Sequence, residues 1–269
     1  MLVTKIIGET TAELSNRLKI QHGYDKVAIC GKLDPMARGE VRVLINQNTK
    51  LMSQYLSSIK TYEFKLVIGV KTDTDDIMGL VTNTGNNDTG NNDTGNHDTG
   101  NHDTGNHDTG NHDTSNISSH ILDICSRKTQ HFHPFSAIKL KIDGVRKSLH
   151  HWALAGKLNT SNLPSKQVSV DQVTIKDSYT VDLHSHYVDI VNRLNRISSH
   201  NRGTFRVDQI LTSWDTTIQS LDRDNITHLE VIPIEMTVSS GFYIRMLAYY
   251  LYEDYGIVSN IFDINRIRT

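Results

Sequence analysis

The chain has 269 residues, enough for one large domain or two small ones with a buried core. It has no run of about 18 apolar residues, which excludes a membrane-spanning helix, and its first residues lack the apolar core of a secretory signal. Two cysteines, Cys30 and Cys125, are too few for a disulfide framework or a cysteine-rich zinc site. They favour a reducing, intracellular compartment, cytoplasmic or nuclear.

The net charge of −2 conceals an uneven distribution of charged residues. Residues 85–114 carry six Asp and no Lys or Arg, so the rest of the chain has a net charge of +4. Residues 127–166 contain eight Lys or Arg against the single acid Asp143. Such a local charge suits a polyphosphate partner, although a solvated basic face has the same pattern.

Several secondary-structure elements can be predicted before the acidic segment. Thr10 and Glu13 form a capping-box pattern, which predicts a helix from there to about Gln21. Residues 62–70 alternate with period two and give the clearest strand signal. The inner face of this strand would carry Tyr62, Phe64, Leu66 and Ile68. Further predictions are a strand over 41–45, a helix over 49–58 and a polar, turn-rich loop over 71–79.

The second half of the chain predicts a mixture of helices and strands. Residues 192–228 are less regular and are expected to be helix with loops. The other predicted elements are a helix over 117–128, strands over 167–175 and 229–238, a helix over 243–254 and a final strand over 260–267.

Residues 85–114 are six copies of a Gly-Asn-(Asn/His)-Asp-Thr pentapeptide. The repeat has no apolar residue, so it cannot fill the core of a solenoid. Its histidines could hold a transition metal weakly, but only four of the six copies carry one. We expect a disordered surface insertion, which costs little because each doubling of a loop adds only about 0.6 kcal/mol.

The segment from Gly31 to Gly39 is the strongest candidate for chemistry. Leu33 and Pro35 flank Asp34, a setting that would shield its carboxylate from bulk water, and the proline biases Asp34 toward an extended backbone. The glycines allow tight turns on both sides. A carboxylate held on such a loop could act as a nucleophile or base, although an Asp-Pro pair alone is usually only a turn.

Six motifs, in order, resemble the TruB family of tRNA pseudouridine synthases. They are Gly31-Lys-Leu-Asp34-Pro-Met-Ala-Arg-Gly39, Asn48-Thr-Lys50, Lys60-Thr-Tyr62, Thr72-Asp-Thr-Asp75 with Gly79, Gln130–Lys139 with Gly144-Val-Arg146, and Ser240–Arg245. The resemblance covers the chain outside the repeat and 192–228. It implies one catalytic domain over 1–269, with an α+β pseudouridine synthase fold: a mixed, mainly antiparallel sheet, flanking helices and a central RNA-binding cleft.

The resemblance implies isomerisation of a uridine, uridine-55 in the T-arm loop of tRNA, to pseudouridine. The C1′–N1 bond breaks, the uracil rotates and a C1′–C5 bond forms, with no cofactor and no metal. Asp34 is implied as the nucleophile, by attack on C1′ or by assisting a glycal intermediate. Arg245 would pair with Asp34 and keep it ionised. Tyr62 would stack on the extruded uracil and act in removal of the C5 proton.

Further residues are implied in substrate binding. Tyr243 and Ile264 would form additional walls, and Lys50 falls on the Thr-Lys of the family. The expected phosphate contacts are Lys139, Lys141, Arg146 and Lys147. Extruding a base costs a few kcal/mol, of which stacking on an aromatic ring can return about 1–3 kcal/mol.

The chain departs from the family pattern at three places. Ile29 stands where the family has a histidine that helps to flip the target region, and His133-Pro134 replaces a Pro-Pro pair. The sequence ends soon after the catalytic motifs, so we expect no C-terminal RNA-binding domain. The expected partner is tRNA alone, bound by a monomer without an obligatory protein partner. Two alternatives stay open: an RNA-binding chaperone that has lost catalysis, and a synthase acting on another RNA.

Overall fold

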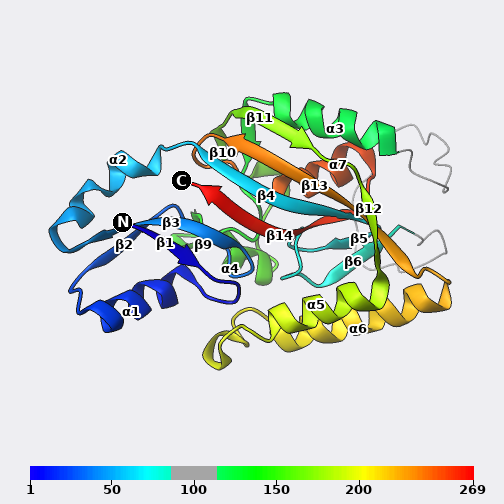
Figure 1. The fold of residues 1–269 in the computed structure, drawn as a ribbon, viewed down its shortest axis with the longest axis horizontal. Coiled ribbons are helices and arrows are strands. Elements are labelled where there is room, and N and C mark those ends of the chain that lie inside the picture. The colour runs from blue at the N-terminus through cyan, green and yellow to red at the C-terminus, as the bar shows by residue number, and fades with distance from the viewer. Residues whose placement is uncertain (86–113) are drawn as a thin grey trace.

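The computed structural model describes residues 1–85 and 114–269 (Figure 1), so the predicted disorder of the repeat and its four histidines lie outside the described residues. An eight-stranded sheet forms the centre, in the order β1-β3-β14-β4-β13-β11, with β2 paired to β3 and β12 to β13. The pairs in this sheet are antiparallel apart from β14 with β3. This confirms the expected α+β class with a mixed, mainly antiparallel sheet.

The bounds of the elements are as follows. The strands of the main sheet are β1 (Leu2–Lys5), β2 (Val27–Cys30), β3 (Arg38–Ile45), β4 (Lys60–Ile68), β11 (Val170–Ile175), β12 (Tyr179–Asp182), β13 (His228–Val238) and β14 (Ser259–Arg268). Two-stranded ribbons are formed by β5 (Val70–Thr72) with β6 (Val81–Thr84), β7 (Thr129–His131) with β10 (Ser165–Gln167), and β8 (Lys139–Ile142) with β9 (Val145–Ser148). The α-helices are α1 (Thr11–His22), α2 (Met52–Leu56), α3 (Thr114–Ser126), α4 (Leu149–Leu154), α5 (Leu183–Leu194), α6 (Val207–Arg223) and α7 (Met246–Tyr255).

Helix α1 begins as its capping box predicts. The Glu13 backbone N–H donates to the Thr10 hydroxyl at 3.1 Å, and the Thr10 N–H donates to the Glu13 carboxylate at 2.7 Å. The helix ends at His22 because Gly23 takes a left-handed conformation, with φ of 67°. None of the described helices is long and apolar enough to cross a membrane.

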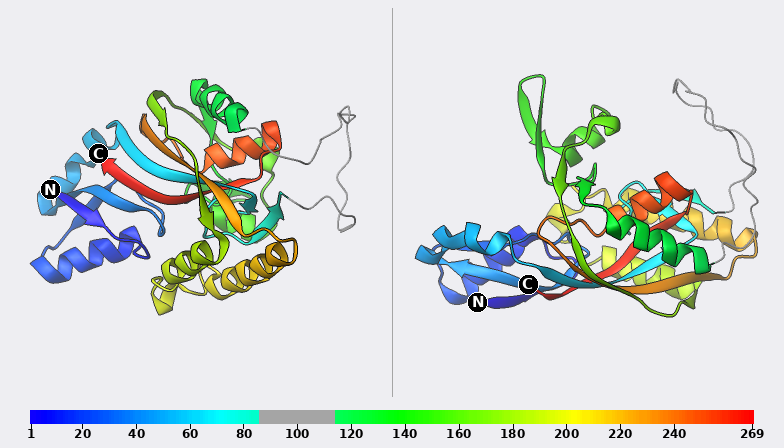
Figure 2. Two further views of the ribbon diagram at one scale, coloured as in Figure 1. Left: turned by 45° about the vertical axis from the view of Figure 1, so that its right-hand side comes forward. Right: turned by 90° about the horizontal axis from the view of Figure 1, so that it is seen from above.

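Helices cover both faces of the sheet (Figures 1 and 2). Helices α1, α3 and α7 contribute to one hydrophobic core, and α5, α6 and the β5–β6 hairpin contribute to a second. Strand β4 lies between them. Its predicted inner face is confirmed, because Tyr62, Phe64 and Leu66 are buried in the first core and Ile68 packs against it, while Val67 is buried in the second.

The structure corrects two sequence predictions. Residues 71–79 are not simply a loop that leads into the repeat, because Val70–Thr72 and Val81–Thr84 pair as the β5–β6 hairpin. The turn of this hairpin is polar but buried, because its polar groups form hydrogen bonds with one another. For example, the Thr72 hydroxyl donates to the Asp76 carbonyl at 2.6 Å. The helix predicted over 49–58 is shorter, because Asn46–Leu51 is a 3₁₀ helix that continues into α2.

The segment between β7 and β10 projects from the sheet and carries β8, β9 and α4, the green part of Figure 2. Asp143 and Gly144 connect β8 to β9 and both have positive φ, as a two-residue hairpin turn requires. The Trp152 indole N–H donates to the Leu140 carbonyl at 3.0 Å and so attaches α4 to the hairpin.

Candidate active site

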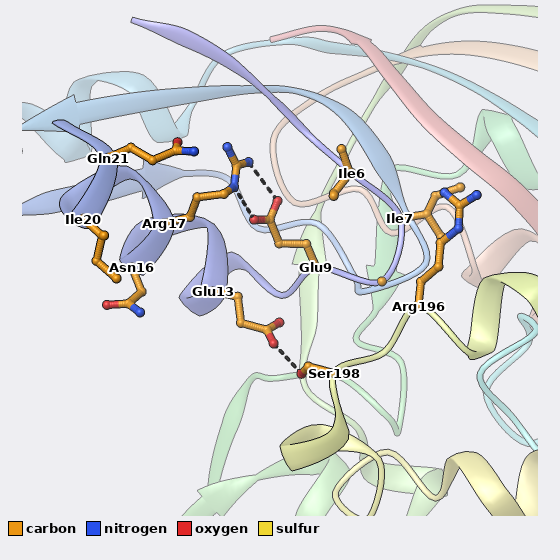
Figure 3. A pocket seen from close by; sticks show the side chains of 11 residues that line it. Ile6, Ile7, Glu9, Glu13, Asn16, Arg17, Ile20, Gln21, Arg196 and Ser198 are labelled. Carbon is orange, nitrogen blue, oxygen red and sulfur yellow. Dashed lines mark hydrogen bonds and ion pairs between the residues drawn. The ribbon is translucent and has the colours of Figure 1, made fainter.

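Asp34 lines a cavity of about 670 Å³, which we call the central cavity. Its walls come from the β2–β3 loop, β4, the β5–β6 turn, residues 132–138, the β13–α7 connection and β14. The volume lies within the 300–1,000 Å³ typical of small-molecule sites. A second cavity of about 650 Å³ lies beside α1 and is lined by residues such as Ile6, Ile20 and Arg196 (Figure 3). It contains none of the predicted site residues.

The structure brings Asp34 together with Arg245 and Tyr243. The Arg245 Nε–H donates to Asp34 Oδ2 at 3.0 Å, and the Tyr243 hydroxyl donates to Asp34 Oδ1 at 3.2 Å. Arg245 Nη2 in turn donates to the Tyr243 oxygen at 3.1 Å. Among the described residues, each carboxylate oxygen therefore has one donor, and the Asp34 side chain is still 32% exposed.

The two partners of Asp34 differ in how burial affects them. Burial and the nearby Asp34 charge raise the pKa of Tyr243 well above its ordinary value, so this hydroxyl keeps its proton and acts as a donor. Burial opposes the charge of Arg245, but the neighbouring carboxylates outweigh it and raise the pKa of Arg245. The guanidinium is fixed further by donating from Nη1 to the Thr74 carbonyl at 2.7 Å.

A second carboxylate shares the same guanidinium. Asp76 Oδ2 lies 3.4 Å from Arg245 Nε, and Asp76 is buried where the β5–β6 turn lines the central cavity. Burial raises the pKa of Asp76 to about 6, with Arg245 acting in the opposite direction. Its Oδ1 accepts from the Thr74 hydroxyl and the Met78 backbone N–H at 2.7 and 2.9 Å, which fixes the turn against Arg245.

A buried lysine holds the loop that carries Asp34. Lys5 at the end of β1 is fully buried, and its ammonium donates to the carbonyls of Pro35 at 3.2 Å and Ala37 at 2.7 Å. Burial lowers the pKa of Lys5 to about 8, and the Asp34 charge raises it in part. At Gly39, which has φ of 116°, a Cβ would lie 2.2 Å from the Arg266 carbonyl oxygen, so the loop end requires glycine.

His133 connects the projecting segment to the β5–β6 turn. It is fully buried, with Nε2 2.8 Å from Asp75 Oδ2, and its Nδ1 accepts the Phe135 N–H at 3.0 Å. Burial lowers the pKa of His133, and a neutral ring that accepts at Nδ1 must carry its proton at Nε2 and donate to Asp75. Asp75 also forms an ion pair with Lys71. The Phe135 carbonyl lies 3.5 Å from Arg245 Nη2, so this network extends to the Asp34 partner.

The other predicted residues fall into two groups. Tyr62 on β4 and Ile264 on β14 are buried and line the central cavity. Lys50 is exposed in the 3₁₀ helix before α2 and does not line the cavity. The four basic residues of the β8–β9 hairpin are also exposed and lie outside the lining: Lys139, Lys141, Arg146 and Lys147. Ile29 is buried in the first core.

Several lining residues were missed by the sequence reasoning. Arg206 makes a two-point ion pair with Asp73 at 2.8 and 3.2 Å and lies over the Phe135 ring at 5.2 Å. Lys60 and Arg266 line the cavity as well. Lys60 lies in the matched motif Lys60-Thr-Tyr62, so the sequence could have indicated it as a site residue. Nothing in the sequence pointed to Arg206 or Arg266. Within the described residues, no three His, Cys, Asp or Glu side chains are grouped to hold a metal ion.

A carboxylate that is both hydrogen-bonded and open to a cavity of this size is suited to attack or proton transfer on a bound organic group. Comparison with known proteins narrows this class. Residues 17–97, which include Asp34 and Tyr62, match the N-terminal domain of the TruB family of pseudouridylate synthases. This match over about the first third of the chain agrees with the resemblance seen in the motifs.

Individual proteins are similar to part of the chain. The chain is 37% identical over 84 residues to tRNA pseudouridine synthase B of Syntrophobacter fumaroxidans, and 36% identical over 84 residues to the protein of the same name from Aquifex aeolicus. Each match covers 31% of this chain, and the chain spans only 28% and 29% of the two relatives. A chain of a solved Cbf5-Nop10-Gar1 complex superposes with a TM-score of 0.49 at 10% identity, covering 99% of this chain and 48% of that one.

Proposed function

We propose that this protein isomerises uridine to pseudouridine in tRNA, at uridine-55 of the T-arm loop, with Asp34 as the nucleophile. The observation that carries the proposal is the Asp34–Arg245–Tyr243 arrangement in the central cavity. Relatives that match this chain are named tRNA pseudouridine synthase B, and their name supplies the substrate class. The target position follows from the family resemblance.

In the proposed reaction, Asp34 acts on the ribose of the target uridine. As the C1′–N1 bond breaks, its electron pair leaves with the uracil, and the carboxylate either bonds to C1′ or assists loss of a ribose proton to give a glycal. After the uracil rotates, C5 forms the new bond to C1′ while the C1′–Asp34 bond breaks or the glycal regains its ribose proton. The C5 proton is then lost and N1 gains a proton. Arg245 and Tyr243 fix the angle of the carboxylate and stabilise its negative charge when it is released.

Tyr62 is one of the aromatic residues that line the cavity. It is buried on β4 and lines the cavity together with Ile264 on β14, the strand next to β4. Stacking of the extruded uracil on this ring would return about 1–3 kcal/mol of the cost of extrusion. We assign Tyr62 the contact with uracil, and with it removal of the C5 proton.

The test compares wild type with Asp34→Asn on an unmodified tRNA transcript, with pseudouridine mapped at each position. Asp34→Asn keeps the shape of the side chain, and we expect it to slow product formation by about 10³-fold or more while tRNA binding is retained. Asp171→Asn is the matched control, since Asp171 is exposed on β11 outside the cavity lining. Normal product formation by Asp34→Asn would contradict the assignment.

A second candidate function is an RNA-binding chaperone without catalysis. It is favoured by Ile29, which is buried in the first core where the family has a histidine that helps to flip the target region. The same assay separates the two functions, because a chaperone binds tRNA but yields no pseudouridine with the wild-type chain. If pseudouridine forms at a different uridine, or only in another RNA, the protein is instead a pseudouridine synthase with a different target.

A further inference from the structure

Four positively charged side chains line the central cavity without acidic partners among the described residues: Lys32, Lys60, Lys166 and Arg266. Three of them are grouped, namely Lys60 on β4, Lys166 on β10 and Arg266 on β14. None of the three forms an ion pair within residues 1–85 and 114–269. A group of like charges beside a cavity is unfavourable unless an anion joins it.

Arg266 gives the most specific evidence. Its side chain is only 1% exposed, its Nε donates to the Glu40 carbonyl at 2.7 Å, and its Nη2 donates to the Gly31 carbonyl at 3.1 Å. Its remaining nitrogen, Nη1, is buried and finds no hydrogen-bond partner among the described residues. A buried donor without a partner costs about 1–3 kcal/mol, so such a group indicates a missing ligand.

Lys60 lies next to this unsatisfied donor. A Cβ built on Gly31 would lie 3.2 Å from Lys60 Cε and 3.3 Å from Arg266 Nη1, so both side chains converge at Gly31. The Lys60 ammonium donates to the Ser58 carbonyl at 2.6 Å and to its hydroxyl at 3.1 Å, which leaves one proton for a ligand. Burial and the charges of Arg266 and Lys166 lower the pKa of Lys60.

Lys166 reaches the same cavity from the projecting segment. A Cβ on Gly241 would lie 2.3 Å from Lys166 Nζ, so this exposed lysine extends over the glycine two residues before Tyr243. Gly31 is three residues before Asp34. The three cations therefore lie beside the two backbone segments that carry Asp34 and its tyrosine partner.

We propose that Lys60, Lys166 and Arg266 bind a phosphate group of the RNA backbone next to the target uridine. This inference rests on the proposed function, since it assumes that RNA enters the central cavity. A guanidinium and two ammonium groups match a phosphate, which offers several acceptor oxygens and a negative charge. A phosphate held here would position the ribose of the neighbouring nucleotide relative to Asp34 before reaction.

The experiment uses synthetic T-arm stem-loops in which one phosphate, either 5′ or 3′ of the target uridine, is an uncharged methylphosphonate. Binding of wild type, Lys166→Ala and the control Lys19→Ala is measured over a range of salt concentrations. Lys166 is exposed, so its loss does not endanger folding, and Lys19 is an exposed lysine of α1 outside the cavity. For wild type and Lys19→Ala, one of the two methylphosphonate stem-loops should bind about tenfold more weakly than the native stem-loop. Lys166→Ala should bind the native RNA more weakly than wild type does, and its slope of log K against log salt should be smaller by about 1. The same methylphosphonate should lower the affinity of Lys166→Ala by less than it lowers the affinity of wild type.

The outcomes separate this site from the proposed function. Equal methylphosphonate effects in wild type and Lys166→Ala, with pseudouridine still formed by wild type, would overturn the phosphate site and leave the activity standing. The predicted coupling without pseudouridine would support the phosphate site and contradict the activity. If inorganic phosphate protects wild type but not Arg266→Lys against thermal unfolding while both methylphosphonates are neutral, the site binds free phosphate and the assignment to RNA is wrong.

Discussion

Arg245 is the residue on which the candidate site depends most. Its buried guanidinium lies between Asp34 and Asp76, at 3.0 and 3.4 Å, and also donates to the Thr74 carbonyl. Removing one partner of a buried ion pair leaves the other charge uncompensated. Arg245 is therefore needed both for the orientation of Asp34 and for the stability of the β5–β6 turn.

Arg245→Ala should lower the free energy of unfolding by about 3–5 kcal/mol and abolish pseudouridine formation. Urea unfolding and the tRNA assay measure the two effects separately. Arg202→Ala is a suitable control, because Arg202 makes a surface pair with Asp208 and a surface hydrogen bond to Asn195, and neither contact involves the site. A stable, fully active Arg245→Ala protein would show that the pair is dispensable.

Asp76 predicts a specific dependence of stability on pH. Because burial raises the pKa of Asp76 to about 6, the folded protein keeps this proton between about pH 4 and pH 6, whereas the unfolded chain releases it. Wild type should therefore lose about 2 kcal/mol of stability, relative to Asp76→Asn, as the pH rises from 4 to 7.5. Urea unfolding of both proteins at the two pH values tests this. A stability difference that does not change with pH would contradict the burial argument.

For single residues, the sequence predicted those that lie in recognisable motifs. It missed those whose role depends on contacts with distant parts of the chain. Asp34, Tyr243 and Arg245 were selected because their neighbours match family motifs. Lys5 and Arg266 act through backbone carbonyls of a loop at least 30 residues away, and a hydrogen bond to a carbonyl leaves no signature in residue type. Such partners become visible only when the register of the sheet is known.

Among the elements, the β8–β9 hairpin is the clearest candidate for an RNA-docking surface. Its four basic residues are exposed, and the only acid in the hairpin is Asp143 at its turn. The hairpin projects from the sheet with α4 (Figure 2). Phosphate contacts at such exposed positions contribute mainly to affinity, in a manner that depends on salt.

Replacing Lys139, Lys141, Arg146 and Lys147 by Gln should weaken tRNA binding with little change in the free energy of unfolding, since exposed side chains contribute little to stability. The slope of log K against log salt should fall by about 1 for each true phosphate contact. A matched control replaces four exposed lysines elsewhere: Lys19, Lys26, Lys128 and Lys176. Equal binding by the two quadruple variants would remove the hairpin from the interface.

The elements also differ in how well the sequence predicted them. Helix α1 and strand β4 were predicted correctly because a capping box and a strict alternation are local signals. The β5–β6 hairpin was missed because its turn is polar yet buried, and only internal hydrogen bonds make that burial possible. Helix α6 has 17 residues, but the sequence predicted only helix with loops over 192–228, without its bounds.

For the whole molecule, the sheet is what assembles the site. Asp34 and Arg245 are 211 residues apart in the sequence, yet they meet because β14 and β4 bring the N-terminal and C-terminal strands together. The family resemblance predicted this meeting. Residue pattern alone could not, since the parallel pairing of β14 with β3 depends on the complete topology.

The pentapeptide repeat joins the β5–β6 hairpin to α3, and we propose that it is a passive insertion. Replacing residues 86–113 by an eight-residue Gly/Ser linker shortens this connection by about two doublings, which should stabilise the fold by about 1 kcal/mol. Pseudouridine formation should stay close to that of the full chain. A large loss of activity or of RNA affinity, with the fold intact, would show that the repeat takes part in function.

The central claim is that the Asp34 carboxylate acts on the ribose of an extruded uridine. The most direct test is the structure of Asp34→Asn bound to a T-arm stem-loop that contains the unmodified target uridine. The account predicts a uridine out of its stack in the central cavity, with C1′ about 3–3.5 Å from an oxygen or nitrogen of residue 34. A bound RNA whose target uridine stays stacked in the loop, or whose ribose lies far from residue 34, would contradict it.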